Sequence, residues 1–382
     1  MQEIGVGIIG FGWFAELIAE SLSTAQGSRL VAIAEIDSER RQLIKTKYPH
    51  VRPLPAAEKL IADKDVDVVI VATPPITHAR LGKKALLAGK HLFLEKPGAL
   101  NPKDMAELKM LADNRGLKAS IDFVMRRNPL YWILKQLQER SVFGQPERAF
   151  LENYAHDDHL AYDHWFWDVN KSGGIWIEHG VHFFDLTNWI LGPVKKSWSD
   201  IIVRPREAII DRVVGTAIHD NDCIVSYYHG FTKPELFEAT TFDLVWERAY
   251  AHIEGWIPTR LSLDALITAE EETYIKDKLI PKAQTFLPGI TLEIVSTDIE
   301  LLPVQQTHLK GRGKEYRVTG RLKLSIALSQ DRWTVYRYLI RQGIVDLCRA
   351  VGTLNYQPAV TLNDAYEALK VAFTFTTISS HN

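Results

Sequence analysis

Short apolar runs and amphipathic stretches alternate over the first 122 residues of the chain. The apolar runs predict strands, and the stretches between them, where apolar residues recur every three or four positions, predict helices. The Val-Val-Ile-Val run at 68–71 has no polar alternation, which is typical of a strand buried on both faces. This alternation predicts an α/β domain built on a doubly wound parallel sheet. The predicted strands are 4–9, 30–35, 66–72, 91–94 and 118–122, and the predicted helices are 14–24, 38–47, 56–62, 78–88 and 102–114.

The pattern changes after residue 123, so we expect a first domain over 1–122 and a second over 123–382. Helices are predicted over 128–140 and 174–191, with a loop rich in His, Asp and aromatic residues between them. The stretch 198–329 is mostly β in pattern, with an exposed helix over 265–285, which favours an α+β domain with a large, open, mainly antiparallel sheet. Helices near 333–351 and 362–378 close the chain, and the last one is expected to pack back on the first domain. The predicted strands here are 213–219, 223–229, 237–245, 249–254, 291–295 and 317–327.

Composition excludes several classes of protein. The 382 residues carry 45 basic and 47 acidic side chains, a net charge of −2, so no basic field exists to hold a nucleic acid or an anionic membrane. Apolar runs stay shorter than the roughly 18 residues that a spanning helix needs. Cys223 and Cys348 lie far apart and lack metal-binding spacing, which fits a reducing compartment. The expectation is a soluble, cytoplasmic protein with a small-molecule partner.

A glycine loop, Gly10-Phe11-Gly12-Trp13-Phe14, joins the first predicted strand to the first predicted helix. Gly10 permits a tight turn, and Gly12 lets backbone N–H groups approach a pyrophosphate that the helix N-terminus stabilises. Glu35 ends the second strand, where a carboxylate can bind ribose hydroxyls. Its charge repels a 2′-phosphate and favours NAD, while the nearby Arg40 and Arg41 leave NADP possible.

Two further strands end in polar or proline-stiffened turns at the edge where a doubly wound sheet binds its ligand. Thr73 and Pro74 follow the third buried strand and precede His78. Glu95-Lys96-Pro97 follows the next strand and places an ammonium group at the same edge, with a proline that is able to take a cis bond.

A polar stripe marks the helix predicted over 174–191. At 3.6 residues per turn, Glu178, His182 and Asp185 fall on one side of a strongly apolar helix, and His179 points about 100° away. Burying such groups is costly unless they are paired, so the stripe is either a satisfied structural network or a site. Periodicity alone leaves both open.

Together these motifs resemble the glucose–fructose oxidoreductase / inositol dehydrogenase (Gfo/Idh/MocA) family. The resemblance implies a Rossmann domain, an α+β domain whose open sheet forms a homodimer or homotetramer, and metal-free hydride transfer at a sugar or cyclitol carbon. It implies that Lys96 and His182 act at the reacting carbon, with Glu178 standing where the family usually has Asp. It also implies cofactor contacts from the glycine loop, Glu35, Thr73, Pro74, His78, Glu95 and Lys96.

The resulting hypothesis is that neutral His182 takes the proton of a substrate hydroxyl while Lys96 stabilises the developing alkoxide and Glu178 orients or shares the proton. Arg126, Tyr154, Trp167 and His179 are expected on the substrate side. Two alternatives compete with a dehydrogenase. One is a metal-dependent hydrolase that uses the loop over 156–168, with His156, Asp157, His159 and His164 as ligands. The other is a sensor or regulator that binds the dinucleotide without turnover.

Overall fold

The protein is described here by a computed structural model that covers residues 3–206 and 208–379. It forms two compact units. The first unit runs to Val124 and also takes in Asp163–Asp185 and Arg337–Phe373. The second unit holds Met125–Tyr162, Leu186–Tyr336 and the chain from Thr374 on. These units first separate between Val124 and Met125, and the domain boundary between residues 122 and 123 stays a prediction.

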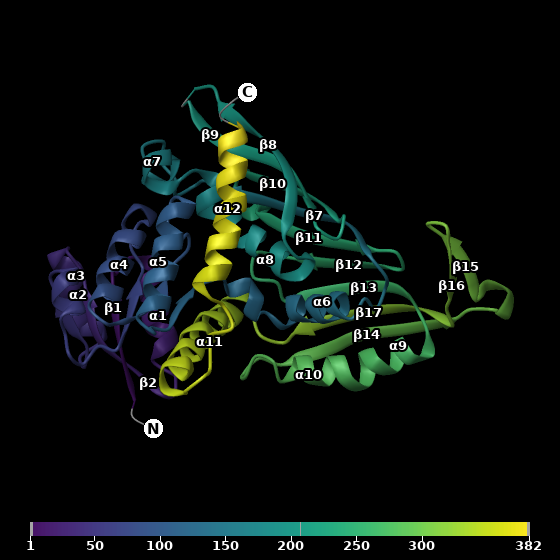
Figure 1. The fold of residues 1–382 in the computed structure, drawn as a ribbon, viewed down its shortest axis with the longest axis horizontal. Helices are drawn as coiled ribbons and strands as arrows, with labels where there is room; N and C mark the ends of the chain where they lie inside the picture. Colours follow the sequence, from purple (N-terminus) through teal and green to yellow (C-terminus); the bar gives the residue numbers. More distant parts are fainter. Residues whose placement is uncertain (1–2, 207, 380–382) are drawn as a thin grey trace. The chain divides into compact units, whose positions relative to one another are not determined.

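A six-stranded parallel sheet forms the centre of the first unit, and Figure 1 labels its strands β1 and β2. The strand order is β3-β2-β1-β4-β5-β6. All four residues of β4 are fully buried, as their apolar run predicts. The strand that the sequence did not predict is β3, a three-residue edge strand that contains Pro53, and proline is tolerated mainly at sheet edges. The predicted α/β fold class is confirmed. The strands are β1 (Ile4–Ile9), β2 (Ser28–Ala34), β3 (Arg52–Leu54), β4 (Val68–Val71), β5 (His91–Leu94) and β6 (Ala119–Ile121).

Helices connect these parallel strands, and their ends follow from local sequence. Asp37 accepts a hydrogen bond from the Arg40 N–H, and Asn101 accepts one from the Asp104 N–H, so both residues act as N-caps. The strand order reverses between β1 and β4, which places a ligand-binding crevice outside the carboxyl ends of these strands. The helices are α1 (Trp13–Leu22), α2 (Ser38–Lys47), α3 (Ala57–Ile61), α4 (His78–Leu87) and α5 (Pro102–Asn114).

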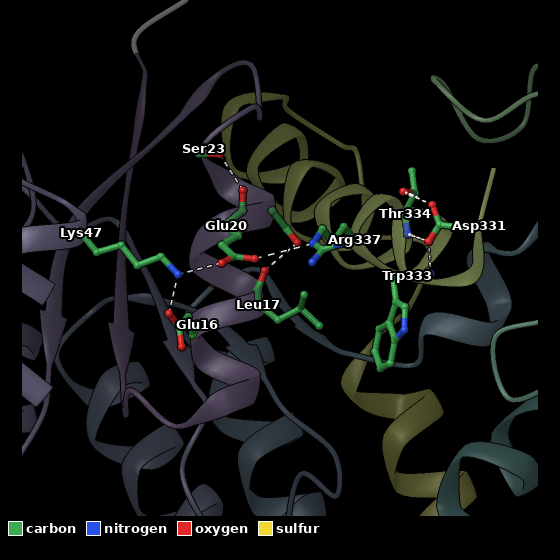
Figure 2. A network of polar contacts seen from close by, with 10 residues as sticks. Glu16, Leu17, Glu20, Ser23, Lys47, Asp331, Trp333, Thr334 and Arg337 are labelled. Atoms are coloured by element: carbon green, nitrogen blue, oxygen red, sulfur yellow. Dashed lines mark hydrogen bonds and ion pairs between the residues drawn. The ribbon is translucent and has the colours of Figure 1, made fainter. Parts of the chain in front are cut away.

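Most of α11 (Arg332–Gly352) and α12 (Leu362–Ser379) also belongs to the first unit. Glu20 of α1 forms ion pairs with Lys47 of α2 at 2.8 Å and with Arg337 of α11 at 3.6 Å (Figure 2). The Ser120 hydroxyl donates to the carbonyl oxygen of Val360 at 2.8 Å. Residues separated by more than 200 positions along the chain therefore share one packed unit.

A nine-stranded sheet dominates the second unit, in the order β14-β17-β13-β12-β11-β7-β10-β9-β8 (Figure 1). Neighbouring strands run antiparallel except β7 and β10, which are parallel. The predicted large, mainly antiparallel sheet is therefore confirmed. Its strands are β7 (Pro146–His156), β8 (Val194–Arg204), β9 (Ile209–His219), β10 (Ile224–Lys233), β11 (Ala239–Trp246), β12 (Ala249–Glu254), β13 (Arg260–Ile267), β14 (Leu292–Leu301) and β17 (Gly320–Leu328).

The sequence pattern predicts a loop after residue 140, whereas the structure has the central strand β7 there. Buried and less buried residues alternate along β7, so the period of two was present but was obscured by charged and aromatic side chains. The strands β8 and β13 are also absent from the predicted set, and a separate hairpin, β15 (His308–Gly311) and β16 (Lys314–Arg317), lies apart from the sheet. The remaining helices are α6 (Pro129–Glu139), α7 (Val169–Ser172), α8 (Val181–Leu191), α9 (Ala269–Tyr274) and α10 (Ile280–Gln284). None of the helices within residues 3–206 and 208–379 has the length and apolar character needed to span a membrane.

Candidate active site

The glycine loop follows β1 in a conformation that its residues dictate. Gly10 has a φ of 98°, and a Cβ atom there would lie 2.4 Å from the carbonyl oxygen of Ala72, so only glycine lets the end of β1 lie against the end of β4. A Cβ atom at Gly12 would meet nothing within 4 Å, so its α-carbon faces open space. Gly12 is also the N-cap of α1 and provides no side-chain cap, which leaves N–H groups of the first helical turn for an anion. This loop fits a pyrophosphate group.

The other residues of the loop differ in exposure. Phe11 is buried and packs edge-on against the ring of Tyr48, so it can contribute to a ligand mainly through its backbone. Trp13 is 65% exposed, and Phe14 beside it is partly buried. The predicted cofactor contact of Phe11 is therefore restricted to main-chain atoms.

Glu35 ties the glycine loop to the end of β2. Its carboxylate accepts the Phe11 N–H at 2.8 Å and the Asp37 N–H at 2.9 Å, and the side chain is buried. An ionised carboxylate offers about four lone-pair positions, so acceptor capacity remains for a ribose hydroxyl. The guanidinium group of Arg41 lies at the same corner, where it donates to the carbonyl oxygens of Glu35 and Ile36 at 2.8 and 2.7 Å.

His78 connects the turns that follow β4 and β5. Its Nδ1 lies 2.7 Å from the carbonyl oxygen of Pro97, and its Nε2 lies 2.5 Å from that of Thr73. The ring is 1% exposed, and burial lowers the pKa of His78. His78 therefore holds the turns after β4 and β5 together, and any effect on a ligand is indirect, through the position of these turns. The Lys96–Pro97 peptide bond is cis, as the sequence allowed.

Lys96 contacts a turn that arrives from a distant part of the chain. Gly173 ends α7 with a φ of 84°, and a π-helical turn over Trp176–Gly180 then leads into α8. The ammonium group of Lys96 donates to the backbone carbonyl oxygen of Glu178 at 2.9 Å and to its Oε1 at 2.7 Å. Both side chains are largely buried, with exposed fractions of 17% and 12%. Single π turns within helices are often found at functional sites.

The π turn corrects the expectation of one continuous α-helix over 174–191. A π turn adds a residue to the helical turn and therefore rotates everything before it relative to the α-helix that follows. Glu178 consequently has Lys96 as its ion-pair partner at 2.7 Å. Glu178 therefore does not lie in the polar stripe that a regular helix of 3.6 residues per turn predicts, because it belongs to the π turn.

Two histidines flank this ion pair, and both are neutral at pH 7. His182 is 3% exposed, and its ring lies edge-on to Phe123 at 6.0 Å. Burial and the nearby Lys96 ammonium hold the pKa of His182 well below its ordinary value. The same two causes lower the pKa of His179 to about 3. A neutral imidazole beside a fixed ammonium group can accept a proton in general acid–base chemistry.

Glu95, which precedes Lys96 in the chain, is buried, and its partner is a residue outside the predicted site. Its side chain hydrogen-bonds that of Asp122, which directly follows β6, and both residues are less than 9% exposed. Burial and the Asp122 charge raise the pKa of Glu95 well above its ordinary value. The sequence could have indicated Asp122, because it is a polar residue at the end of the strand predicted over 118–122 and such ends form the ligand edge of a parallel sheet.

The residues expected on the substrate side are divided between the units. His179 and Trp167 belong to the first unit, and Arg126 and Tyr154 belong to the second. The Arg126 guanidinium group lies 5.8 Å from the ring centroid of Trp189, and the Tyr154 hydroxyl donates to Glu152 at 3.0 Å. A shared role for these four residues stays a prediction.

The residues of the metal-site alternative are divided in the same way. His156 belongs to the second unit, where it lies 3.3 Å from Glu238, and His164 belongs to the first. In the part of the chain that the structure describes, no three His, Cys, Asp or Glu side chains are grouped so that they could hold a metal ion.

The neutral state of His182 makes stability depend on pH. The unfolded chain binds a proton on this residue below about pH 6.5, whereas the folded protein does not, so stability is lost as the pH falls through that value. Between pH 7.5 and 5.5 we expect the free energy of unfolding of the parent protein to fall about 1.4 kcal/mol further than that of His182→Gln. Denaturant unfolding at both pH values measures this difference. The exposed His50, changed to Gln, is the control and should leave the pH dependence intact. Parallel pH dependence in parent and His182→Gln would contradict the assignment.

Comparison with known proteins supplies the family. Residues 4–123 match the model described as the oxidoreductase family with an NAD-binding Rossmann fold. Residues 131–244 match the C-terminal domain model of the same GFO/IDH/MocA family. The two matches together cover more than half of the chain; the first includes the six-stranded sheet, and the second includes the part of the nine-stranded sheet that lies before residue 245.

Individual relatives agree with these matches over part of their length. Inositol 2-dehydrogenase of Rhizobium meliloti is 28% identical over 213 residues, which are 55% of this chain and 61% of the relative. Myo-inositol 2-dehydrogenase of Thermotoga maritima is 27% identical over 215 residues, 56% of this chain and 61% of the relative. The matched region thus spans little more than half the length of these curated relatives.

Solved structures extend the likeness to the whole fold. The WlbA dehydrogenase of Bordetella pertussis, in complex with NADH and UDP-GlcNAcA, superposes with a TM-score of 0.77 at 16% identity, covering 100% of this chain and 96% of that one. Scyllo-inositol dehydrogenase of Lactobacillus casei, with bound NAD(H) and scyllo-inositol, has a TM-score of 0.72 at 16% identity, covering 100% and 98%. Because the family's two models match residues 4–123 and 131–244, more than half of the chain, the chain belongs to the Gfo/Idh/MocA oxidoreductase family.

Proposed function

We propose that the protein is an NAD(P)-dependent dehydrogenase or reductase that acts on a carbon of a sugar, a cyclitol or a related polyhydroxy compound. The observation that carries this proposal is the grouping of Lys96, Glu178 and the neutral His182 in the same unit as the glycine loop. A nucleotide-binding module alone needs no buried ammonium group beside a neutral histidine. The inositol dehydrogenases among the relatives support the substrate class.

The cofactor would be held by residues already described. The N–H groups at the start of α1 and the open face of Gly12 would receive the pyrophosphate, and the Glu35 carboxylate would receive the ribose hydroxyls. Thr73 and Pro74, positioned by His78, would line the place for the nicotinamide beside Lys96. The nicotinamide ring, when bound, supplies the acceptor or donor of a hydride, and the protein supplies the position of the reactants and the electrostatic field.

Each polar side chain of the site has a separate task in this proposal. Lys96 provides a positive charge that stabilises an alkoxide as it develops on the substrate oxygen. His182, neutral because it is buried beside that charge, accepts the hydroxyl proton during oxidation and returns it during reduction. Glu178 fixes the Lys96 ammonium through two hydrogen bonds, so it is a positioning residue for Lys96. This assignment replaces the hypothesis that Glu178 orients or shares the substrate proton.

Substrate recognition, assembly and location remain part of the proposal. His179, Trp167, Arg126 and Tyr154 are proposed to bind the hydroxyl-rich substrate. A homodimer or homotetramer is supported by apolar side chains exposed on the nine-stranded sheet, among them Trp198 and Tyr250. The two cysteines, both free and buried, fit a reducing compartment such as the cytoplasm.

A coupled binding and turnover experiment tests the proposed function. NADH and NADPH are titrated by fluorescence, and NAD⁺ and NADP⁺ are then incubated with a panel of aldoses and cyclitols while nicotinamide absorbance is followed. The reverse reaction is run with the matching keto compounds. Dinucleotide binding with turnover of a polyhydroxy compound supports the proposal. Tight binding without turnover across the panel would favour a sensor, and absence of binding would contradict both.

Glu35 is expected to set the choice between the two dinucleotides. Replacing it with Gln removes the charge that repels a 2′-phosphate and weakens the charge-assisted hydrogen bond to the ribose, while Arg41 stays at the same corner. A hydrogen bond to a charged group contributes about 1.5–3 kcal/mol, so the preference for NADH over NADPH should fall by about tenfold or more. Fluorescence titration of both dinucleotides measures the ratio. Glu39→Gln, an exposed change in the first turn of α2, is the control. An unchanged ratio in Glu35→Gln would refute this role.

A further inference from the structure

Two carboxyl groups lie together at the ligand edge of the parallel sheet. Glu95 directly follows β5, and Asp122 directly follows β6. Because Leu94 and Ile121 are paired in the strand register, the next residue on each strand is brought to the same level of the sheet. The Asp122 N–H donates to the carbonyl oxygen of Leu94 at 2.9 Å, which fixes this level. The exposed fractions are 7% for Glu95 and 1% for Asp122.

The contact between these side chains requires a proton. Their carboxyl groups are hydrogen-bonded to each other, and two ionised carboxylates have acceptors only. In addition, Oε1 of Glu95 is buried and makes no hydrogen bond with the described residues, so a full negative charge on this group would be poorly compensated. Two carboxyl groups that share a buried site hold one proton more strongly than either would alone.

Charged groups of opposite sign act on Glu95. Asp122 opposes its ionisation, and the Lys96 ammonium, which follows it in the chain, favours ionisation. Lys96 is already paired with the carboxylate of Glu178. The charge of the carboxyl pair therefore adds directly to the negative charge that acts on the Lys96 ammonium.

We propose that Glu95 and Asp122 share a single proton at neutral pH and that this pair sets the negative charge beside Lys96. With one shared proton the pair carries one negative charge. Loss of that proton at higher pH adds a second negative charge, which holds the ammonium more firmly and reduces the positive field available to a substrate oxygen. Glu95 and Asp122 are thus positioning residues that act through Lys96. The effect on catalysis rests on the proposed function, whereas the shared proton does not.

The shared proton can be observed without turnover. A protonated carboxyl group has an infrared C=O stretch that an ionised carboxylate and an amide lack. We expect this band in the folded protein at pH 7, and we expect its loss in both Asp122→Asn and Glu95→Gln. In each variant the amide takes the place of the protonated partner and leaves the other carboxylate ionised. Asp113→Asn, an exposed change near the end of α5, is the control and should keep the band.

The parent protein alone also decides the matter, so the test does not depend on the folding of a variant. Its protonated-carboxyl band should decline in one step as the pH is raised above neutral. Absence of the band at pH 7, or its persistence in both variants, overturns the proposal.

The consequence for Lys96 has its own measurement. The pH profile of kcat for the parent protein should fall on the alkaline side over the same range in which the infrared band is lost. Asp122→Asn should lose that alkaline transition, because no shared proton remains to dissociate, and Asp113→Asn should retain it. An alkaline transition that persists in Asp122→Asn overturns the link to Lys96. If no substrate is turned over but the band behaves as expected, the proposed function fails and the shared proton stands.

Discussion

Lys96→Met is expected to lower turnover by at least about a hundredfold while the affinity for NADH changes little. Removing one preorganised group that stabilises developing negative charge commonly costs about 10²–10³ in kcat. The Lys96 ammonium group is held in place by the two hydrogen bonds that it donates to Glu178 in the first unit, so a mobile surface lysine cannot replace it. The dinucleotide would depend mainly on the glycine loop and Glu35, which the substitution leaves intact. Steady-state kinetics and NADH fluorescence titration measure the two effects separately.

A matched control makes this experiment specific. Lys103→Met removes an exposed lysine in the first turn of α5 and should leave both turnover and binding near those of the parent protein. Circular dichroism confirms that each variant is folded. Retained turnover in Lys96→Met, with the fold intact, would remove Lys96 from the proposed mechanism.

The two glycines of the nucleotide loop are expected to fail for different reasons when each is changed to Ala. At Gly10 the φ of 98° strains any side chain, and the added Cβ atom would overlap a backbone oxygen at 2.4 Å. Strain and overlap of this kind cost about 1–3 kcal/mol each, so Gly10→Ala should lower the free energy of unfolding by about 2–6 kcal/mol. At Gly12 the φ is −78° and the Cβ atom points into open space, so Gly12→Ala should cost about 1 kcal/mol or less.

NADH affinity should distinguish the two glycine variants in the opposite way from stability. Gly12→Ala keeps its fold but places a methyl group where the pyrophosphate must approach, so NADH affinity should fall by about tenfold or more. Denaturant unfolding and fluorescence titration of both variants test the contrast, and each variant is the other's control. Equal losses of stability in the two variants would mean that the loop does not have the described conformation.

Much of the fold could be predicted because its patterns are local. Buried parallel strands such as β4 and β5 are continuous apolar runs, and capping residues such as Asp37 and Asn101 mark where α2 and α5 begin. β7 was missed because its neighbours in the sheet, β10 and β11, come more than 60 residues later in the chain. Pairing over such distances gives a central strand its burial, and a local pattern reports it only weakly.

The site could also be predicted only in part. Lys96 could be selected because it lies in the turn that follows a buried strand and precedes a proline, which places it at the ligand edge of the sheet. The partner of Glu178 could not, because a π turn changes the direction of a side chain without a sequence signature that periodicity detects. The contact of Asp122 with Glu95 could not be predicted either, because it depends on the register between β5 and β6.

The order of the segments in the first unit constrains how the protein can be made. Glu178 and His182 lie on a segment that rejoins this unit after a passage through the other one, and residues 337–373 rejoin it later still. A nascent chain that has left the ribosome only as far as residue 124 therefore lacks both the partner of Lys96 and the contact between Ser120 and Val360. The nucleotide-binding unit can be completed only after the segment that ends at Phe373 has been translated, so a gene fragment that stops after the parallel sheet would encode an unfinished unit that lacks both His179 and His182.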